Sequence, residues 1–464
     1  MKGGTRTFLG IPYAQPPVGE LRFAAPEPVT HWAGVLQASA FGPSCVQPAG
    51  ALSAPGDQSE DCLSLNVYSP AKTPKQGAPV MVFIHGGAFV SGGSSQYDGT
   101  RLAEEGNAVV VTLNYRLGAL GFFSHPDIVD SGNAALQDQQ LALHWVKDNI
   151  AAFGGDPDNI TLFGESAGSA SVCTQMVSPG AAGLANRYIM ESGVCIGGLQ
   201  FLSQAQAQAI STGLSASLCG DAVDTVACLR ELDPNAMVNW GTELSLFGAG
   251  WAPTVIADST TLPAAPLALF MTGQYHPGAV ILGTNQNEWG LFQLIRSAAS
   301  VSSVAELTAV IDGLFGPAAP YVKAQYLPAS DEQANAELIR LYTDTVFRCP
   351  TRSLARMLSA QGTPVWLYSF DEGLAYHAME LPYVFGKPNP LLAPELVETL
   401  RASVQGYWTG FAANGDPNQD GQPMWPAFDM LGDQHMSLQT VSEADSHLAK
   451  SACDMWDLLL GSAE

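Results

Sequence analysis

The sequence predicts an α/β protein built around a mostly parallel β-sheet. Helical patterns alternate with strand-like segments, and the clearest helix covers residues 133–154, where apolar residues recur at steps of three and four. The strand-like segments are short, rich in β-branched residues and almost continuously apolar, as expected for strands buried on both faces. They are residues 79–84, 108–113, 159–163, 279–283 and 364–370. Strands that alternate with helices are typical of a parallel sheet flanked by helices.

The chain has 464 residues, of which 47% are hydrophobic. This length and composition suffice for one large core or two ordinary domains. We find no internal repeat, low-complexity linker or block of like charges, and we therefore expect a single domain over residues 1–464. The stretch from about 300 to 360 looks helical and could form a subdomain. A monomer is the favoured state, although the sequence leaves the oligomeric state open.

The charge balance argues against one class of partner. The chain carries 19 basic and 43 acidic residues, which gives a formal net charge of −24 at pH 7. Such a surface repels phosphate backbones, so we do not expect nucleic-acid binding. No apolar run is long enough for a membrane span. The first residues, MKGGTRTFLGIPYAQPP, also lack the long apolar core of a signal peptide, so we expect none within this chain.

Cysteine usage points to an oxidising compartment. None of the cysteines forms a C-x-x-C pair, which disfavours a zinc ribbon or a thioredoxin-type site. An even number in loop-like sequence fits disulfides and a secreted or periplasmic location. Buried free thiols in a cytoplasmic protein are the alternative that the sequence leaves open. The cysteines are Cys45, Cys62, Cys173, Cys195, Cys219, Cys228, Cys349 and Cys453.

The stretch TLFGESAGSA, residues 161–170, carries the first candidate for chemistry. Ser166 stands between Gly164 and Gly168, where a predicted strand passes into a predicted helix. A sharp turn at this point needs glycine on both sides, because side chains there would clash with the neighbouring chain. The pattern is that of a nucleophile elbow, which exposes a serine hydroxyl at the end of a sheet and at a helix N-terminus.

A serine nucleophile also needs backbone donors for the oxyanion that forms. VFIHGGAFVSGG, residues 82–93, follows an earlier predicted strand and matches an oxyanion loop of the H-G-G-G type. We interpret His85 as a residue that shapes this loop. A phosphate-binding loop is the rival interpretation, but no G-K-[ST] follows the glycines.

Several long motifs occur in one order along almost the whole chain, and together they resemble the type-B carboxylesterases. This family includes cholinesterases and bacterial para-nitrobenzyl esterases, and the resemblance implies the α/β-hydrolase fold. The motifs are FLGIPYAQPPVGELRF (8–23), SEDCLSLNVYSP (59–70), HGGAFVSG (85–92), LNYRLGALGFF (113–123), FGGDPDNITLFGESAGS (153–169), GTNQNEWGLF (283–292), HAMELPYVFG (377–386) and FAANGDPN (411–418).

The resemblance implies a catalytic triad. The family's serine matches Ser166, its acid in G-T-N-x-x-E matches Glu288, and its histidine matches His377. Spacing alone leaves Asp258 and Asp371 open as acids, and the resemblance makes both structural. The order serine, acid, histidine is the one that α/β-hydrolases use.

The resemblance also implies the surroundings of the triad. Its oxyanion donors match the N–H groups of Gly87, Ala88 and Ala167. Glu380, three residues after His377, is expected to support that histidine without meeting the substrate. Chemistry of this kind needs no metal and no cofactor.

The cysteine pairing is likewise implied by the resemblance. It pairs Cys45 with Cys62, Cys219 with Cys228, and Cys349 with Cys453. Cys173 and Cys195 have no counterpart in this pattern. We expect Cys173 to be a buried thiol, and a bridge between these two residues stays an open alternative.

The expected activity is hydrolysis of carboxylic esters with short to medium acyl chains and a broad range of alcohols. The loop from Cys45 to Cys62 contains no aromatic residue on which a quaternary ammonium could rest, so choline esters are disfavoured. The alternatives within the fold are a lipase and an amidase or carbamate hydrolase. An adhesion-type binding protein is the alternative from another class, and it would lack a working nucleophile.

Overall fold

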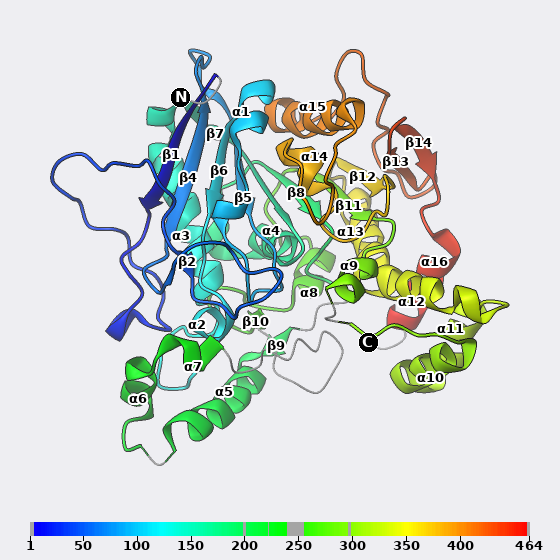
Figure 1. Ribbon diagram of the computed structural model, residues 1–464, viewed down its shortest axis with the longest axis horizontal. Coiled ribbons are helices and arrows are strands. Elements are labelled where there is room, and N and C mark those ends of the chain that lie inside the picture. Colours follow the sequence, from blue (N-terminus) through cyan, green and yellow to red (C-terminus); the bar gives the residue numbers. More distant parts are fainter. Residues whose placement is uncertain (1–3, 198–200, 221, 239–254, 296–297, 462–464) are drawn as a thin grey trace.

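The computed structural model describes residues 4–197, 201–220, 222–238, 255–295 and 298–461. Its centre is a 10-stranded sheet in the order β1-β4-β6-β5-β7-β8-β11-β12-β13-β14 (Figure 1). The strands of this sheet are β1 (Thr5–Pro12), β4 (Ser64–Pro70), β5 (Ala78–Ile84), β6 (Val109–Leu113), β7 (Gly155–Glu165), β8 (Arg187–Glu191), β11 (Ala279–Asn285), β12 (Val365–Phe370), β13 (Gln434–Leu438) and β14 (Glu443–Ser446).

The sheet is parallel from β6 through β13, and its edges are antiparallel. β1 and β4 run antiparallel at one edge, and β14 does so at the other. The predicted strands are β5, β6, β7, β11 and β12, so the predicted fold class is confirmed. The other five strands of the sheet, β1, β4, β8, β13 and β14, were not predicted. In β8 and β13, polar residues interrupt the short apolar runs.

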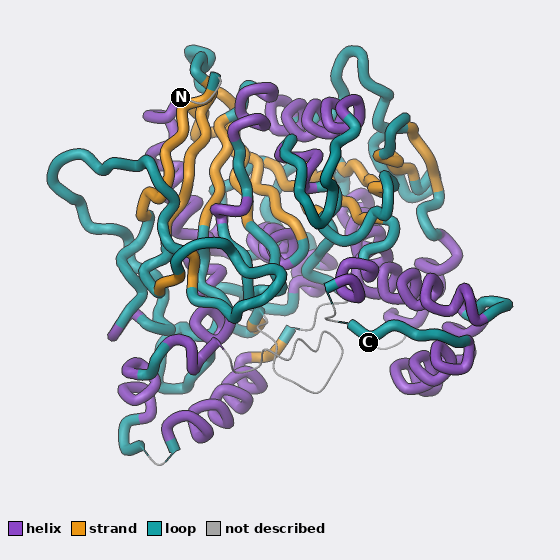
Figure 2. The backbone as a smooth tube through the Cα atoms, in the orientation of Figure 1, coloured by secondary structure: helices purple, strands orange, loops and turns teal. Residues whose placement is uncertain are grey.

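Helices surround the sheet, as the tube in Figure 2 shows. They are α1 (Thr100–Gly106), α2 (Gly118–Phe122), α3 (Ala134–Asn149), α4 (Ala167–Val177), α5 (Gln204–Cys219), α6 (Thr225–Glu231), α7 (Pro234–Val238), α8 (Pro266–Met271), α9 (Trp289–Leu294), α10 (Val304–Phe315), α11 (Ala319–Tyr326), α12 (Ala334–Tyr342), α13 (Cys349–Ala360), α14 (Leu381–Phe385), α15 (Glu398–Asn414) and α16 (Lys450–Gly461). Two short strands, β2 (Ser44–Cys45) and β3 (Gln58–Ser59), form a separate pair, and so do β9 (Leu202–Ser203) and β10 (Ile256–Ala257). Among the described residues, no helix is both long and apolar enough to cross a bilayer.

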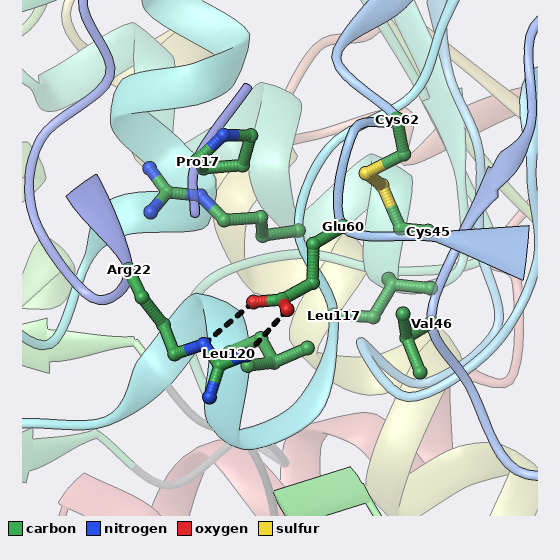
Figure 3. Close-up of a pocket in the computed structure, with 9 residues that line it drawn as sticks. Pro17, Arg22, Cys45, Val46, Glu60, Cys62, Leu117 and Leu120 are labelled. Atoms are coloured by element: carbon green, nitrogen blue, oxygen red, sulfur yellow. Dashed lines mark hydrogen bonds and ion pairs between the residues drawn. A yellow bond between two sulfur atoms is a disulfide. The ribbon is translucent and has the colours of Figure 1, made fainter. Parts of the chain in front are cut away.

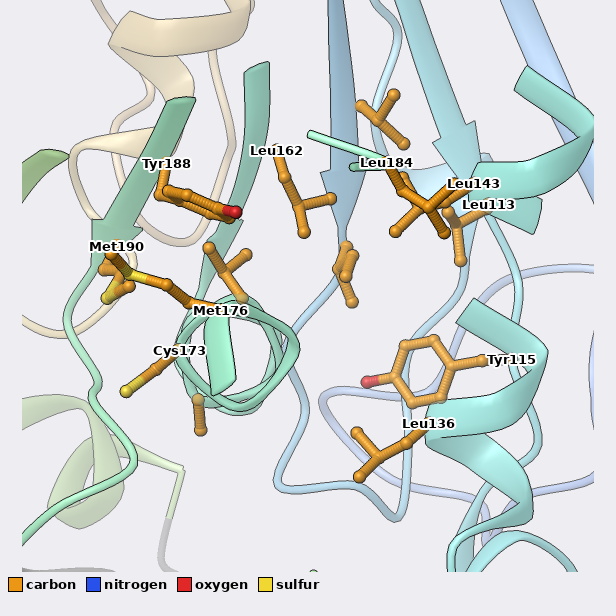
Figure 4. Packing of buried hydrophobic residues seen from close by; sticks show 14 of the residues in the cluster. Leu113, Tyr115, Leu136, Leu143, Leu162, Cys173, Met176, Leu184, Tyr188 and Met190 are labelled. Atoms are coloured by element: carbon orange, nitrogen blue, oxygen red, sulfur yellow. The ribbon is translucent and has the colours of Figure 1, made fainter. Parts of the chain in front are cut away.

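Both faces of the sheet are buried, as the continuously apolar strands require. Val80 and Val82 of β5 point into one core, which contains residues of α3, α4 and α13. Met81 and Phe83 point into the other, which contains residues of α1, α14 and α15. Successive side chains of a strand alternate between its faces, so one apolar run supplies two cores. Figure 4 shows the first core around Leu162 and the side chains of α4.

A third apolar cluster lies in the predominantly helical stretch from α10 to α13. Leu307, Val322 and Leu338 pack there with Trp456 of α16. A π-helical segment, Thr343–Arg348, joins α12 to α13. The assignment of this stretch as a subdomain stays a prediction.

Disulfides close four loops of the structure. Cys45–Cys62, Cys219–Cys228 and Cys349–Cys453 are the pairs that the family resemblance implies. The expectation of a free thiol at Cys173 is wrong, because this residue is bonded to Cys195. β7 and β8 are neighbours in the sheet, so α4 and the loop after β8 lie side by side. Four disulfides indicate an oxidising compartment.

A buried ion pair ties the first disulfide loop to a distant helix. The Arg22 guanidinium donates to both carboxylate oxygens of Glu60, at 2.7 and 2.5 Å, beside the Cys45–Cys62 bridge (Figure 3). The same guanidinium donates to the carbonyls of Leu229 and Leu232 at the end of α6. These contacts fix the base of the loop that forms one wall of the cavity described below.

Candidate active site

Ser166 occupies a strained turn between β7 and α4. Its φ and ψ angles are 57° and −123°, outside the regions that non-glycine residues usually adopt. The flanking glycines allow close packing: a Cβ atom added to Gly168 would lie 2.0 Å from the carbonyl oxygen of Ile84, and one on Gly164 2.6 Å from the carbonyl carbon of Gly168. The Ser166 N–H donates to the carbonyl of Glu191 at 2.9 Å, which holds the turn against the end of β8.

His377 and Glu288 form a buried pair. Nδ1 of His377 lies 2.7 Å from Oε2 of Glu288, and the other carboxylate oxygen accepts the N–H of Asn285 at 2.6 Å. Phe292 and Phe347 flank the imidazole ring, with centroids 5.1 and 4.9 Å away. A carboxylate on Nδ1 favours the tautomer with its hydrogen there, which leaves Nε2 as the basic nitrogen.

The two aspartates that spacing left open lie in other environments. Asp258 is exposed and follows β10. The Asp371 carboxylate accepts the hydroxyls of Ser369 and Ser437, at 2.6 and 2.5 Å. Both arrangements fit the structural role that the resemblance assigns to these aspartates.

Ser166 and His377 line the same cavity. Among the described residues, Nε2 of His377 has no hydrogen-bond partner, and so no hydrogen bond joins it to Ser166. Glu165, which directly precedes Ser166, has Oε1 at 3.1 Å from this Nε2. Contacts between a catalytic base and its nucleophile are often loose in the absence of substrate. The geometry therefore brings Nε2 of His377 against the carboxylate of Glu165, the residue that directly precedes Ser166.

Glu165 is a functional candidate that was not predicted from the sequence, although its place directly before the serine was a signal. Burial raises the pKa of Glu165 to about 8, against the opposing effect of His377. For His377, burial lowers the pKa, but the nearby carboxylates of Glu165 and Glu288 outweigh it and raise the pKa to about 9. The two side chains therefore stabilise each other's charged forms.

Two further buried carboxylates complete a group that we call the glutamate cluster: Glu165, Glu191, Glu288 and Glu380. Burial raises the pKa of Glu380 to about 7, and it raises that of Glu191 well above the usual range. Glu191 accepts the indole N–H of Trp408 at 2.6 Å. Glu380 accepts the side-chain amide of Asn285 at 2.5 Å, and the backbone of Asn285 in turn bonds Glu288. Asn285 therefore links Glu380 to the His377–Glu288 pair by hydrogen bonds.

Residues 86–93, here called the glycine loop, lie against Ser166. A Cβ atom added to Gly86 would lie 3.0 Å from Cβ of Ser166. Gly87 has a φ of 105°, and its added Cβ would lie 2.1 Å from the carbonyl oxygen of Ser91, so only glycine fits. The backbone of the glycine loop therefore approaches the serine directly.

Two peptide planes of the glycine loop have fixed orientations. Nδ1 of His85 lies 2.8 Å from the Gly86 carbonyl, which shares a planar peptide with the Gly87 N–H. The Ser91 N–H donates at 3.0 Å to the Gly87 carbonyl, which shares a peptide with the Ala88 N–H. Burial lowers the pKa of His85 to about 4, so its ring is neutral, and it stacks on Tyr115 at 4.4 Å. The loop-shaping interpretation of His85 fits these contacts.

The cavity has a volume of about 460 Å³ and opens to solvent. Ser166, His377, Gly87 and Ala88 lie on its wall, while Glu288 is buried behind His377. Much of the remaining wall is apolar: Val90, Leu291, Phe292, Ile295, Leu381, Pro382 and Phe385. Residues 48–53 of the first disulfide loop and residues 387–392 also line it.

Three features meet at one cavity: an elbow serine after a central parallel strand, a buried histidine–carboxylate pair and a glycine loop. Together they define an α/β-hydrolase. The chain belongs to the carboxylesterase family, whose model matches residues 1–456, and it is a carboxylic ester hydrolase. It is 36% identical over 501 residues to human (Homo sapiens) carboxylesterase 3, covering 98% of this chain and 86% of the relative.

Two further relatives span both human and bacterial enzymes. The chain is similar to the cocaine esterase of Homo sapiens, with 35% identity over 98% of this chain and 87% of the relative. It is also similar to the para-nitrobenzyl esterase of Bacillus subtilis (strain 168), with 37% identity over 92% of this chain and 90% of the relative.

Proposed function

We propose that the protein is a serine carboxylesterase that works through an acyl-enzyme on Ser166. His377 takes the proton of the Ser166 hydroxyl as its oxygen attacks the ester carbonyl. Glu288 holds the imidazole in the required tautomer and stabilises the imidazolium. The observation that carries this proposal is the buried 2.7 Å contact between His377 and Glu288 beside the cavity that Ser166 lines.

The tetrahedral intermediate carries a negative oxygen, which the N–H groups of Gly87, Ala88 and Ala167 stabilise. The fixed peptide planes of the glycine loop support the first two donors, because preorganised dipoles need no rearrangement during the reaction. Ala167 begins α4, where backbone N–H groups point out of the helix. His377 then protonates the departing alcohol, and water repeats the cycle on the acyl-enzyme.

The substrates that we propose are esters of short to medium acyl chains with varied, including aromatic, alcohols. An apolar cavity of about 460 Å³ that opens to solvent supports this range. The names of the relatives, a para-nitrobenzyl esterase and a cocaine esterase, refer to esters with bulky parts. Residues 48–53 contain no aromatic residue, so this part of the cavity wall offers no ring on which a quaternary ammonium could rest.

The experiment is a panel of p-nitrophenyl esters from acetate to palmitate, with an anilide and a carbamate, run on the native protein and on Ser166→Ala. We expect hydrolysis of acetate and butyrate, labelling of Ser166 by a fluorophosphonate, and loss of both in Ser166→Ala. Ser171→Ala, another buried serine of α4, is the matched control and should keep both.

Each other outcome points to a different function. Undetectable hydrolysis of the short esters together with rapid cleavage of the long ones would replace the proposal with a lipase. Preference for the anilide or the carbamate would indicate an amidase or carbamate hydrolase. An unlabelled Ser166 without any hydrolysis would indicate a binding protein.

The four disulfides also support a secreted or periplasmic location. Titration of thiols in protein taken from its native source tests this location. We expect no free thiol after unfolding without reductant, whereas eight free thiols would place the protein in a reducing compartment.

A further inference from the structure

Gln47 is a buried residue of the first disulfide loop, and its side chain is fully hydrogen-bonded. Its Oε1 accepts the N–H groups of Gly92 and Ala54, and its Nε2 donates to the carbonyls of Gly92 and Cys45, all at 2.9 Å. A glutamine amide offers two acceptor sites and two hydrogens, so these four bonds use its whole capacity. The residue is 3% exposed, so water cannot replace these bonds.

These bonds join two walls of the cavity. Gln47 and Ala54 bracket residues 48–53, which line the cavity and which we call the wall segment. Gly92 belongs to the glycine loop on the other side of the amide. One side chain therefore holds both ends of the wall segment and pairs with both backbone groups of a residue in the glycine loop.

Gly92 packs on one of the two peptides that carry the proposed oxyanion donors. A Cβ atom added to Gly92 would lie 2.7 Å from the Gly86 carbonyl oxygen and 2.7 Å from Nδ1 of His85. That carbonyl orients the Gly87 N–H. Ser91, the preceding residue, donates its N–H to the Gly87 carbonyl, which orients the Ala88 N–H. A shift of residues 91–92 would consequently turn both donor groups.

We propose that Gln47 is a positioning residue for the oxyanion hole, which it fixes by clamping Gly92 to the wall segment. This inference rests on the proposed function, because it takes Gly87 and Ala88 as the oxyanion donors. Donors must lie about 2.7–3.1 Å from the oxyanion, and the interaction matters most in the transition state. Loss of the clamp should therefore lower kcat and leave KM almost unchanged.

The test is Gln47→Met, which has similar length and makes none of the four bonds. With p-nitrophenyl butyrate we expect kcat to fall about 10-fold or more and KM to change less than about 2-fold. Affinity for a trifluoromethyl ketone, which forms an anionic adduct with the serine, should fall by a similar factor. A purely structural role would not make these two losses run in parallel.

Asn133→Leu is the matched control. The Asn133 amide also pairs with both backbone groups of one residue, at 2.9 Å to the Ile256 N–H and 2.7 Å to its carbonyl, but it does not line the cavity. We expect this variant to lose thermal stability and keep its kcat. An equal fall of kcat in both variants, or an unchanged kcat in folded Gln47→Met, would overturn the inference.

Gln47→Asn serves if the methionine variant does not fold. It keeps the amide, but it is one methylene too short to reach Gly92 and Ala54 together. A partial fall of kcat at constant KM supports the inference, and an unchanged kcat overturns it. Ser166→Ala is measured alongside. Activity in that variant would overturn the proposed function. If Ser166→Ala is inactive and the Gln47 variant keeps its kcat, only the proposed role of Gln47 is overturned.

Discussion

Glu165 and His377 lie in direct contact, with Oε1 of the carboxylate 3.1 Å from Nε2 of the ring. Glu288 contacts the other ring nitrogen, so the imidazole lies between two buried carboxylates. Because Ser166 follows Glu165 in the chain, the nitrogen proposed to take the serine proton has a carboxyl neighbour, which is negative once the pH exceeds its pKa of about 8. This arrangement favours the imidazolium and makes the activity sensitive to pH.

Replacement of Glu165 by glutamine should move the acid limb of the pH–rate profile. The neutral form of His377 is the proposed base. Because its pKa is raised to about 9, we expect the rate to increase as pH rises through this value. Glu165→Gln removes a charge that raises this pKa, so we expect the limb to move to lower pH by about one unit. The measurement is kcat/KM for p-nitrophenyl acetate between pH 5 and 10.

Glu191→Gln is the control for this shift. Glu191 is as deeply buried and belongs to the same cluster, but it is not among the carboxylates that contribute most to raising the pKa of His377. The acid limb of the Glu191→Gln pH–rate profile should stay close to that of the native protein. A Glu165→Gln profile that is unmoved, or moved to higher pH, would contradict the role assigned to this contact.

Glu288→Gln should lower kcat by about 10³–10⁴-fold, because an amide cannot stabilise the imidazolium and favours the wrong tautomer. KM should change little, since Glu288 is buried behind His377 and does not line the cavity. Asp258→Asn tests the specificity of the effect, because Asp258 is exposed and was one of the two alternative acids in the sequence. A loss of activity in the aspartate variant, with Glu288→Gln still active, would reverse the assignment.

Gly87→Ala should lower kcat by about 10²-fold, because the new methyl group would meet the Ser91 carbonyl and turn the donor peptides. Gly183→Ala separates this effect from simple backbone strain. Gly183 also has a positive φ, 74°, but no atom lies within 4 Å of its added Cβ. We expect it to cost about 1 kcal/mol of stability and no activity. Equal kcat values for the two variants would argue against an oxyanion role for the loop.

Loss of the Cys349–Cys453 disulfide should destabilise the protein more than loss of Cys219–Cys228. The first pair is separated by 104 residues and the second by 9, and a longer closed loop restricts the unfolded chain more. We expect costs of about 4–5 and about 3 kcal/mol for the paired alanine variants, read from urea unfolding. The opposite order would mean that contacts in the folded state, such as Arg352 with Asp433 and Asp454, outweigh loop entropy.

The local part of the site could be read from the sequence. The strand before Ser166, the glycines on either side of it and the helix after it act within a few residues of one another, and the elbow in the structure has that form. His377 and Glu288 are 89 positions apart, and only the family resemblance selected them. Spacing gave no reason to prefer Glu288 over Asp258 or Asp371.

The contacts that were not predicted from the sequence depend on strand order. The Cys173–Cys195 bridge and the position of Glu191 require β8 beside β7, and β8 was not recognised. The contact between Glu165 and His377 requires β7 and the segment after β12 to end at one edge of the sheet. Gln47 gave no signal at all, because a lone glutamine in a loop is usually exposed.

The sequence by itself determined the fold class and the glycine-flanked turn at Ser166, because apolar periodicity and glycine sterics operate over short distances along the chain. The family followed from the resemblance of its ordered motifs. Only the tertiary structure decided which buried carboxylates surround His377, how Cys173 is paired and what holds the glycine loop. Those contacts join residues from distant segments. They form, and stabilise the protein, only once the strands have assembled in the order observed.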